Sequence, residues 1–296
     1  MQTRKTFIQD TIAMVYDFDG TLSPQPMQEY TVLPELGIDP TAFWAEVNQQ
    51  SHELGQERML TYMRLLLEKA EERHVHIGRD EFKKLGKNVE YFSGVETWFN
   101  RIHKFVDQIS DKSIKVKHYI ISAGLREILD GVSIHKHFDH IFASEYHYNH
   151  HKVATFPKIL ITDTTKTQYL FRINKGKEDL RESINTHMPV EQRPIPFENI
   201  IYIGDGDSDV PSMTVTQHNG GNAIAVYKQG RTASEKKTHD ACKELLQAGR
   251  VNFIAPADYS PDSKLETRVH LLLRSIVARI DYQQELHLCQ KEQGLV

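Results

Sequence analysis

The sequence lacks the features that would assign it to several special classes of protein. Cys242 and Cys289 are its only cysteines, which excludes a disulfide framework beyond one bridge and fits a reducing compartment. No stretch approaches the ~20 consecutive apolar residues that a membrane span needs. Gln9 and Asp10 interrupt the N-terminal segment before it reaches the apolar length of a signal peptide. We therefore expect a soluble, cytoplasmic protein that does not enter a membrane.

A concentration of positive charge is also missing. The formal net charge is −4, and the lysines and arginines are scattered along the chain. A dedicated nucleic-acid-binding protein would show a basic stripe, so no nucleic-acid partner is expected. A small anionic substrate remains compatible with this charge, because a local cationic pocket can exist in a mildly acidic protein. With 39% hydrophobic residues, the chain can form one large or two medium cores, which argues against a disordered protein.

Strand-like and helix-like segments alternate along most of the chain. Apolar runs of strand length lie at 11–16, 116–121, 141–143, 200–203, 223–226 and 252–254. Helices are predicted at 95–106, 175–185, 234–247, 263–284 and from residue 210, and a hairpin is predicted from 158–162 and 167–172. This alternation predicts an α/β fold with a doubly wound, mainly parallel sheet. The last helix is interpreted as docked on the core, with a dimerisation helix as the alternative.

The segment from Ser23 to Val89 differs from the rest because it contains helical patterns and no strand. Asp39 and Pro40 are suited to the N-cap and first position of a helix at 41–54. Apolar residues at three- and four-residue steps predict further helices at 58–73 and 80–87. We therefore expect two domains: a core formed by 1–22 and 90–296, and a small α-helical domain at 23–89.

The strongest chemical signal is the segment Asp-Phe-Asp-Gly-Thr-Leu at 17–22, directly after the first predicted strand. Three further polar groups follow in the chain: Ser122 after the strand at 116–121, Lys175 in the segment INKGK, and the acidic segment Gly-Asp-Gly-Asp-Ser-Asp at 204–209. Three of the four lie at the carboxyl ends of predicted strands, where open α/β sheets bind ligands. In this order they resemble the four motifs of the haloacid dehalogenase superfamily.

The resemblance implies a Rossmann-like core and hydrolysis of a phosphomonoester through an aspartyl-phosphate. Asp17 would be the nucleophile, and Asp19 would exchange protons with the leaving oxygen and with the attacking water. Ser122, Ala123 and Lys175 would bind the phosphoryl oxygens. The metal ligands implied are the Asp17 carboxylate, the Asp19 backbone carbonyl and Asp205, with Asp209 supporting the site. Mg²⁺ prefers such oxygen ligands and would offset the repulsion between a carboxylate and a phosphate.

Each of these residues taken singly also has an ordinary structural interpretation. An Asp-Gly pair after a strand usually forms a turn, a serine there usually caps a helix, and a single lysine usually faces solvent. The occurrence of all four motifs in this order favours an enzyme over these structural interpretations. The lysine is the least certain of the set, and its rivals are Lys158, Lys166 and Lys177.

The helical segment at 23–89 corresponds in position to the superfamily's cap domains, and the chain is similar in arrangement to the phosphoserine phosphatase-like branch. Inward-facing cap residues would select the leaving group; the candidates are Gln25, Gln28, Glu29, Tyr30, Arg58 and Arg64. The acidic residue with which that branch holds its substrate's amino group has no counterpart here, which argues against phosphoserine. We expect a small phosphorylated metabolite as substrate.

Two other functions and one other site are also compatible with these residues. A phosphotransferase would pass the phosphoryl group to an acceptor hydroxyl, and a regulatory module would bind phosphoryl groups without catalysis. A histidine-rich segment offers metal-ligating side chains: His135, His137, His140, His147, His150 and His151. Its irregular spacing favours a solvated surface over a transition-metal site.

Overall fold

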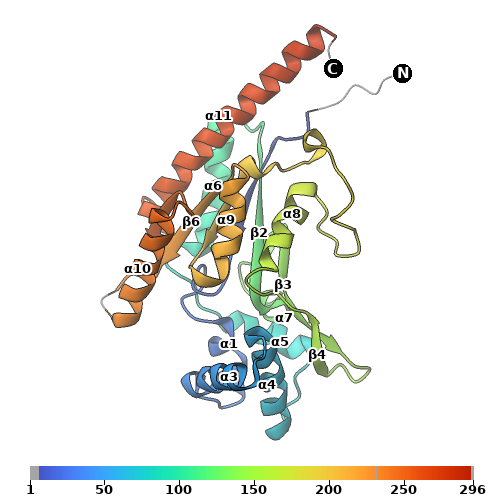
Figure 1. Ribbon diagram of the computed structural model, residues 1–296, viewed down its shortest axis with the longest axis vertical. Coiled ribbons are helices and arrows are strands. Elements are labelled where there is room, and N and C mark those ends of the chain that lie inside the picture. Colours follow the sequence, from blue (N-terminus) through green and yellow to red (C-terminus); the bar gives the residue numbers. More distant parts are fainter. Residues whose placement is uncertain (1–6, 231, 295–296) are drawn as a thin grey trace.

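The computed structural model describes residues 7–230 and 232–294. Residues 1–6, which begin the segment examined for a signal peptide, lie outside this description. Seven strands form one sheet in the order β4-β3-β2-β1-β5-β6-β7 (Figure 1). The strands are β1 (Thr11–Tyr16), β2 (Lys115–Leu125), β3 (His140–Tyr148), β4 (Ala154–Ile159), β5 (Ile200–Gly204), β6 (Asn222–Tyr227) and β7 (Phe253–Pro256).

Six of the strands run parallel to one another, and β4 alone pairs antiparallel, with β3. The predicted α/β fold with a doubly wound, mainly parallel sheet is therefore confirmed. The predicted hairpin of 158–162 with 167–172 is wrong. The hairpin is made by β3 and β4, because β3 continues past the predicted end at Ala143 and the chain turns back near His150.

Helices cover both faces of the sheet, and the alternation of side chains along β1 shows how. Ile12, Met14 and Tyr16 belong to the core cluster beneath α6 (Val95–Ile109) and α11 (Lys264–Glu292). Ala13 and Val15 point to the other face, as strand geometry requires. That face is covered by α8 (Lys166–Lys175), α9 (Val210–His218) and α10 (Ala233–Gln247). All six residues of β1 are buried, which is typical of the central strand of a parallel sheet.

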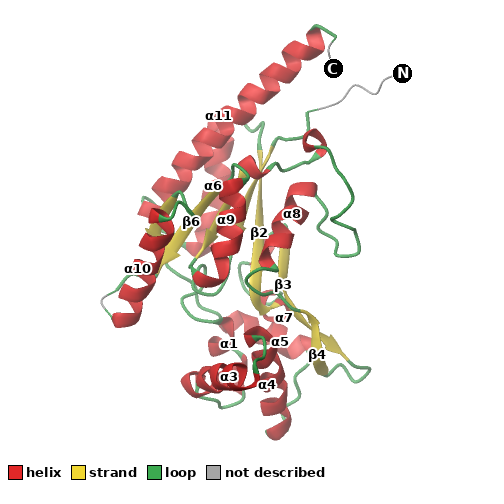
Figure 2. Cartoon of the chain, in the orientation of Figure 1, coloured by secondary structure: helices red, strands yellow, loops and turns green. Residues whose placement is uncertain are grey.

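The region from residue 160 to β5 differs from the prediction. Residues 166–175 form the helix α8 in place of a strand, and the helix expected at 175–185 does not exist. Gly176 ends α8 in the left-handed conformation, at φ 62°. In Figure 2 the chain from there to β5 runs mainly as loop. Arg172 holds this loop, because its guanidinium donates hydrogen bonds to the backbone carbonyls of Lys177, Asp179 and Glu182.

The segment from residue 23 to residue 89 is helical, as predicted, and lies at one end of the sheet (Figure 1). It contains α1 (Met27–Tyr30), α2 (Val32–Glu35), α3 (Pro40–Leu54), α4 (Arg58–Glu72) and α5 (Arg79–Leu85); α6 follows it, and α7 (Arg126–Leu129) follows β2. Asp39 caps α3 by accepting a hydrogen bond from the Ala42 amide at 2.8 Å. Tyr146 in β3 donates a hydrogen bond to the Met63 carbonyl in α4, so the β3–β4 hairpin packs against the helices.

The last helix docks on the core, as predicted. Leu265, Val269, Leu273, Ile276 and Ile280 of α11 are buried at three- and four-residue steps. The helix extends to Glu292, beyond its predicted end at residue 284. Among the described residues, no helix is both long enough and apolar enough to cross a bilayer.

Candidate active site

The loop after β1 brings Asp17 and Asp19 to the carboxyl end of the sheet. The Asp17 amide donates to the Ile203 carbonyl of the neighbouring strand β5, and the carbonyl of buried Phe18 accepts from Leu22 and Ser23. Gly20 turns the loop at φ 79°. A Cβ atom there would lie 2.0 Å from the Asp205 Oδ2 atom, so only glycine allows the two acidic loops to approach this closely.

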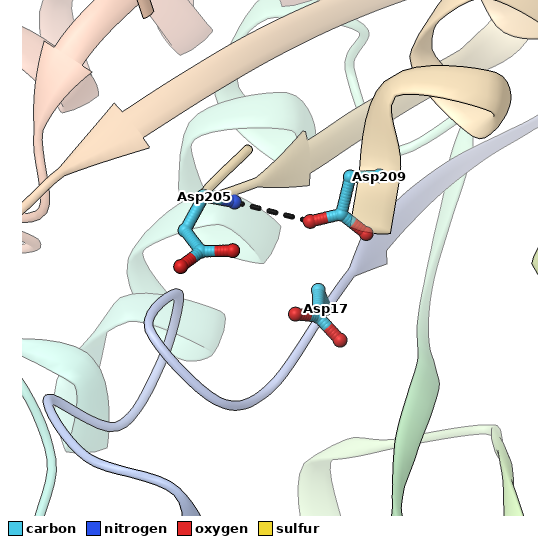
Figure 3. A group of neighbouring side chains, drawn as sticks. All are labelled: Asp17, Asp205 and Asp209. Atoms are coloured by element: carbon cyan, nitrogen blue, oxygen red, sulfur yellow. Dashed lines mark hydrogen bonds between the residues drawn. The ribbon is translucent and has the colours of Figure 1, made fainter. Parts of the chain in front are cut away.

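The loop after β5 brings Asp205 and Asp209 to the same place, as Figure 3 shows. Asp209 is fully buried and its carboxylate accepts three hydrogen bonds within the protein. They come from the Lys166 ammonium at 2.8 Å, the Tyr202 hydroxyl at 2.6 Å and the Asp205 amide at 3.1 Å. These bonds occupy most of its lone pairs. Asp209 thus fixes the position of the Asp205 backbone and of the lysine.

Asp17, Asp205 and Asp209 each place a carboxylate oxygen within 4.8 Å of the others, a spacing suited to a metal ion. The electrostatics of the pocket also fit a cation. Burial and the charge of Asp209 raise the pKa of Asp17 to about 7, and burial and the same neighbour raise the pKa of Asp205 well above its usual value. The single positive charge of Lys166 does not balance the negative charges of Asp17, Asp205 and Asp209. A divalent cation held by the Asp17 and Asp205 oxygens would favour their ionised forms.

Lys166 occupies the place that the sequence analysis assigned to Lys175. Its side chain is 1% exposed, and its ammonium lies 3.0 Å from Asp17 Oδ1 and 2.8 Å from Asp209 Oδ1. Lys175 lies at the other end of α8, about 13 Å further along the helix axis. Its ammonium donates to the backbone carbonyls of Ile184 and Thr186 in the following loop. The placement of Lys175 at the site is therefore corrected to Lys166.

A signal for Lys166 was present in the sequence. Leu170 and Ile173 follow it at four and seven residues, so a helical reading of 166–175 places all three on the buried face. Because 167–172 was predicted to be a strand, this helical pattern was not recognised. The rivals Lys158 and Lys177 are also engaged elsewhere, with Glu145 and with the Ser183 carbonyl.

The end of β2 contributes Ser122 and Ala123, as the sequence analysis placed them. Ser122 is buried, and its hydroxyl oxygen accepts a hydrogen bond from the Gly124 amide at 2.9 Å. Both residues line a pocket of about 670 Å³ that also contains Asp17, Asp19, Lys166 and Asp205. A buried hydroxyl beside a buried ammonium provides hydrogen-bond donors for an anionic group in this pocket.

Asp19 lies at the junction between the acidic loop and the helical insertion. Its Oδ1 atom accepts a hydrogen bond from the Met27 amide, at the start of α1, at 2.8 Å. Burial and the nearby Asp17 raise the pKa of Asp19 to about 8. A carboxyl group with this pKa is largely protonated at neutral pH and can act as a proton donor.

The helical insertion supplies one wall of the pocket, but only two of its six candidate residues reach it. Gln28 and Arg58 line the pocket, together with Trp44, Met59 and Tyr62, which the sequence analysis did not single out. Gln25 and Tyr30 line a separate cavity, Arg64 pairs with Glu68, and Glu29 accepts a hydrogen bond from the Trp44 indole. Asp163 and Lys237 enter from the core side.

The histidine-rich segment forms no candidate metal site in the part of the chain that the structure describes, where the acidic group is the one found. His150 and His151 contact each other, with ring centroids 3.8 Å apart, and both are exposed. His147 is exposed as well, whereas His135, His137 and His140 are half-buried, so the segment is only partly a solvated surface.

Comparison of the chain with known proteins identifies its family. The family model described as haloacid dehalogenase-like hydrolase matches residues 14–214. An uncharacterised protein of Borreliella burgdorferi is 27% identical over 281 residues, which cover 87% of this chain and 94% of that protein.

Solved structures share the fold at low sequence identity. A probable phosphoserine phosphatase from Vibrio cholerae aligns with a TM-score of 0.56 at 12% identity, over 93% of this chain and 68% of that one. A phosphoserine phosphatase in a phospho-aspartyl intermediate analogue state aligns with a TM-score of 0.53 at 14% identity, over 88% and 99%. A haloacid dehalogenase family hydrolase from Salmonella enterica serovar Typhi gives 0.52 at 19% identity, over 79% and 67%.

Proposed function

The chain belongs to the family of haloacid dehalogenase-like hydrolases, and we propose that it is a phosphatase that hydrolyses a small phosphomonoester through an aspartyl-phosphate on Asp17. One observation supports this most directly. The Asp17 carboxylate lies 3.0 Å from a buried ammonium, and both line a pocket that also holds a protonatable second acid, Asp19. A nucleophile, a positive charge for the transferred group and a proton donor are the parts that this reaction needs.

In the first step, a carboxylate oxygen of Asp17 attacks phosphorus and the bond from phosphorus to the ester oxygen breaks. Protonated Asp19 gives its proton to that oxygen, which leaves as an alcohol. In the second step, ionised Asp19 takes a proton from water as the water oxygen attacks phosphorus. The bond to Asp17 breaks and inorganic phosphate is released.

Lys166 and Ser122 act on the phosphoryl oxygens during both steps. The Lys166 ammonium, fixed by Asp209, offsets negative charge that would otherwise repel the Asp17 carboxylate. The Ser122 hydroxyl, positioned by its bond to the Gly124 amide, can donate to a phosphoryl oxygen. Mg²⁺ bound by Asp17, the Asp19 carbonyl and Asp205 would withdraw charge from the phosphoryl group.

Hydrolysis of p-nitrophenyl phosphate tests this proposal. We expect turnover by the wild-type protein with Mg²⁺, and turnover at background level for Asp17→Asn. Circular dichroism and thermal unfolding of both proteins control for folding. Equal activity of the two proteins would refute the assignment of the nucleophile. If the wild-type protein hydrolyses no phosphomonoester, the proposal that it is a phosphatase is refuted.

A further inference from the structure

One wall of the active-site pocket would contact the leaving group of the substrate, so its side chains determine which leaving groups fit. It is built from the helical insertion: Pro26 and Gln28 at α1, Trp44 in α3, and Met59 and Tyr62 in α4. The Met27 amide that holds Asp19 immediately precedes Gln28 in the chain. Because Asp19 is the proton donor proposed for the ester oxygen, the group attached to that oxygen must lie against this wall.

The buried part of this wall carries no charge. Apart from Lys166 and the acidic cluster of Asp17, Asp19 and Asp205, four charged side chains line the pocket, and all are exposed: Glu57, Arg58, Asp163 and Lys237. Two of them already have partners within the protein. The Arg58 guanidinium donates to Asn48 and lies 5.6 Å from the centre of the Trp44 ring, and Glu57 caps α4 by accepting from the Leu60 amide.

Gln28 and Tyr62 carry the buried polar groups of this wall, and their side chains hydrogen-bond each other. Gln28 is 2% exposed, and its carbonyl oxygen Oε1 has no hydrogen-bond partner among the residues described here. A buried acceptor without a partner is destabilising, so a ligand that supplies a hydrogen-bond donor is favoured. The amide is neutral, and therefore it can accept from a hydroxyl group without having to balance a charge.

The energetics of burial separate two classes of leaving group. An amino-acid alcohol such as serine would bring an ammonium and a carboxylate into a wall that offers no buried countercharge for either. Burying an unpaired charge is far more costly than burying a hydroxyl that is hydrogen-bonded. The half-buried Trp44 ring adds a flat apolar surface, held in place by the hydrogen bond from its indole nitrogen to Glu29 at 2.8 Å.

We propose that the substrate is the phosphomonoester of an uncharged, hydroxyl-bearing alcohol, such as a sugar or another polyol, and that Gln28 selects it by accepting a hydrogen bond from a hydroxyl group. The apolar C–H face of such an alcohol would lie on Trp44. This inference rests on the proposed phosphatase function and adds the class of substrate to it.

The test compares substrates that differ in the charge of the alcohol. We expect kcat/KM for a hexose 6-phosphate or glycerol 3-phosphate to exceed that for O-phosphoserine and O-phosphoethanolamine by at least about tenfold, since a missing partner for a buried charge costs more than 1.4 kcal/mol. The variant Gln28→Glu places a carboxylate on the wall. It should lower the ratio of kcat/KM for the hexose phosphate to that for O-phosphoethanolamine by about tenfold or more.

Gln25→Glu is the matched control. It makes the same chemical change three residues earlier, at an exposed side chain that lines the separate cavity, and should leave the ratio at the wild-type value. A wild-type preference for the two amino-bearing substrates would overturn the inference without any need for a variant. An unchanged ratio in folded Gln28→Glu would also overturn it.

Hydrolysis of p-nitrophenyl phosphate separates this inference from the function on which it rests. If wild type hydrolyses that compound but prefers amino-bearing substrates, the substrate class is wrong and the phosphatase stands. If no phosphomonoester is hydrolysed, both the substrate class and the phosphatase function are refuted.

Discussion

Replacement of Lys166 by methionine separates the two lysines that could act in this site. Methionine retains the length and apolar stem of the side chain but removes the charge that lies 3.0 Å from Asp17 and 2.8 Å from Asp209. Loss of a fixed charge at a phosphoryl-transfer site lowers the rate by about 10³-fold or more, equivalent to ~4 kcal/mol of transition-state stabilisation. We expect kcat/KM for p-nitrophenyl phosphate to fall by that amount.

Lys175→Ala is the control for this prediction. The residue donates to two backbone carbonyls of a surface loop, and loss of such bonds costs about 1 kcal/mol each in the free energy of unfolding. Its kcat/KM should stay within about twofold of wild type, because the ammonium has no contact with the acidic cluster. Urea unfolding of both variants shows whether they are folded in the assay. A large loss of activity in folded Lys175→Ala, with little loss in Lys166→Met, would refute the reasoning.

Three further predictions concern the proton donor, the metal and a buried histidine. Asp19→Asn should lower kcat/KM for an alkyl phosphate by ~10²–10⁴-fold but have less effect with p-nitrophenyl phosphate, whose leaving group needs little protonation; equal losses on both would contradict the role of Asp19. Excess chelator should abolish turnover and added Mg²⁺ should restore it, and full activity in chelator would contradict the metal site. Burial holds the pKa of His118 well below its usual value, so the unfolded chain binds a proton that the folded protein does not. Below about pH 6.5 this histidine should therefore add a loss of up to ~1.4 kcal/mol of stability per pH unit, so urea unfolding at each pH should show that wild type loses more stability than His118→Phe as the pH falls. Equal slopes for the two proteins would contradict this prediction.

The acidic part of the site could be placed from sequence because of where its residues stand on strands. Asp17, Ser122 and Asp205 each follow a buried apolar run, and the carboxyl ends of parallel strands meet at one edge of the sheet. Strand adjacency then brings these residues together regardless of the distance between them in the chain. Their catalytic roles remain predictions.

The lysine could not be placed with the same security, because it comes from a helix. A helix approaches the sheet edge at an angle that sequence periodicity does not determine, and the segment 167–172 has too few residues to separate a strand from a helix. The pocket wall formed by the helical insertion was harder still to predict. Trp44 and Tyr62 belong to different helices, and their rings meet only through the packing of α3 on α4, with centroids 5.8 Å apart.

The covalent intermediate on Asp17 is the central claim, and rapid-quench trapping tests it most directly. Wild-type protein is mixed with p-nitrophenyl phosphate and Mg²⁺, stopped in acid within the first turnover, digested and analysed by mass spectrometry. We predict an acid-stable, hydroxylamine-labile phosphoryl group on the peptide that contains Asp17, and none in Asp17→Asn. Phosphoryl label on any other residue, or steady turnover by Asp17→Asn, would contradict the account.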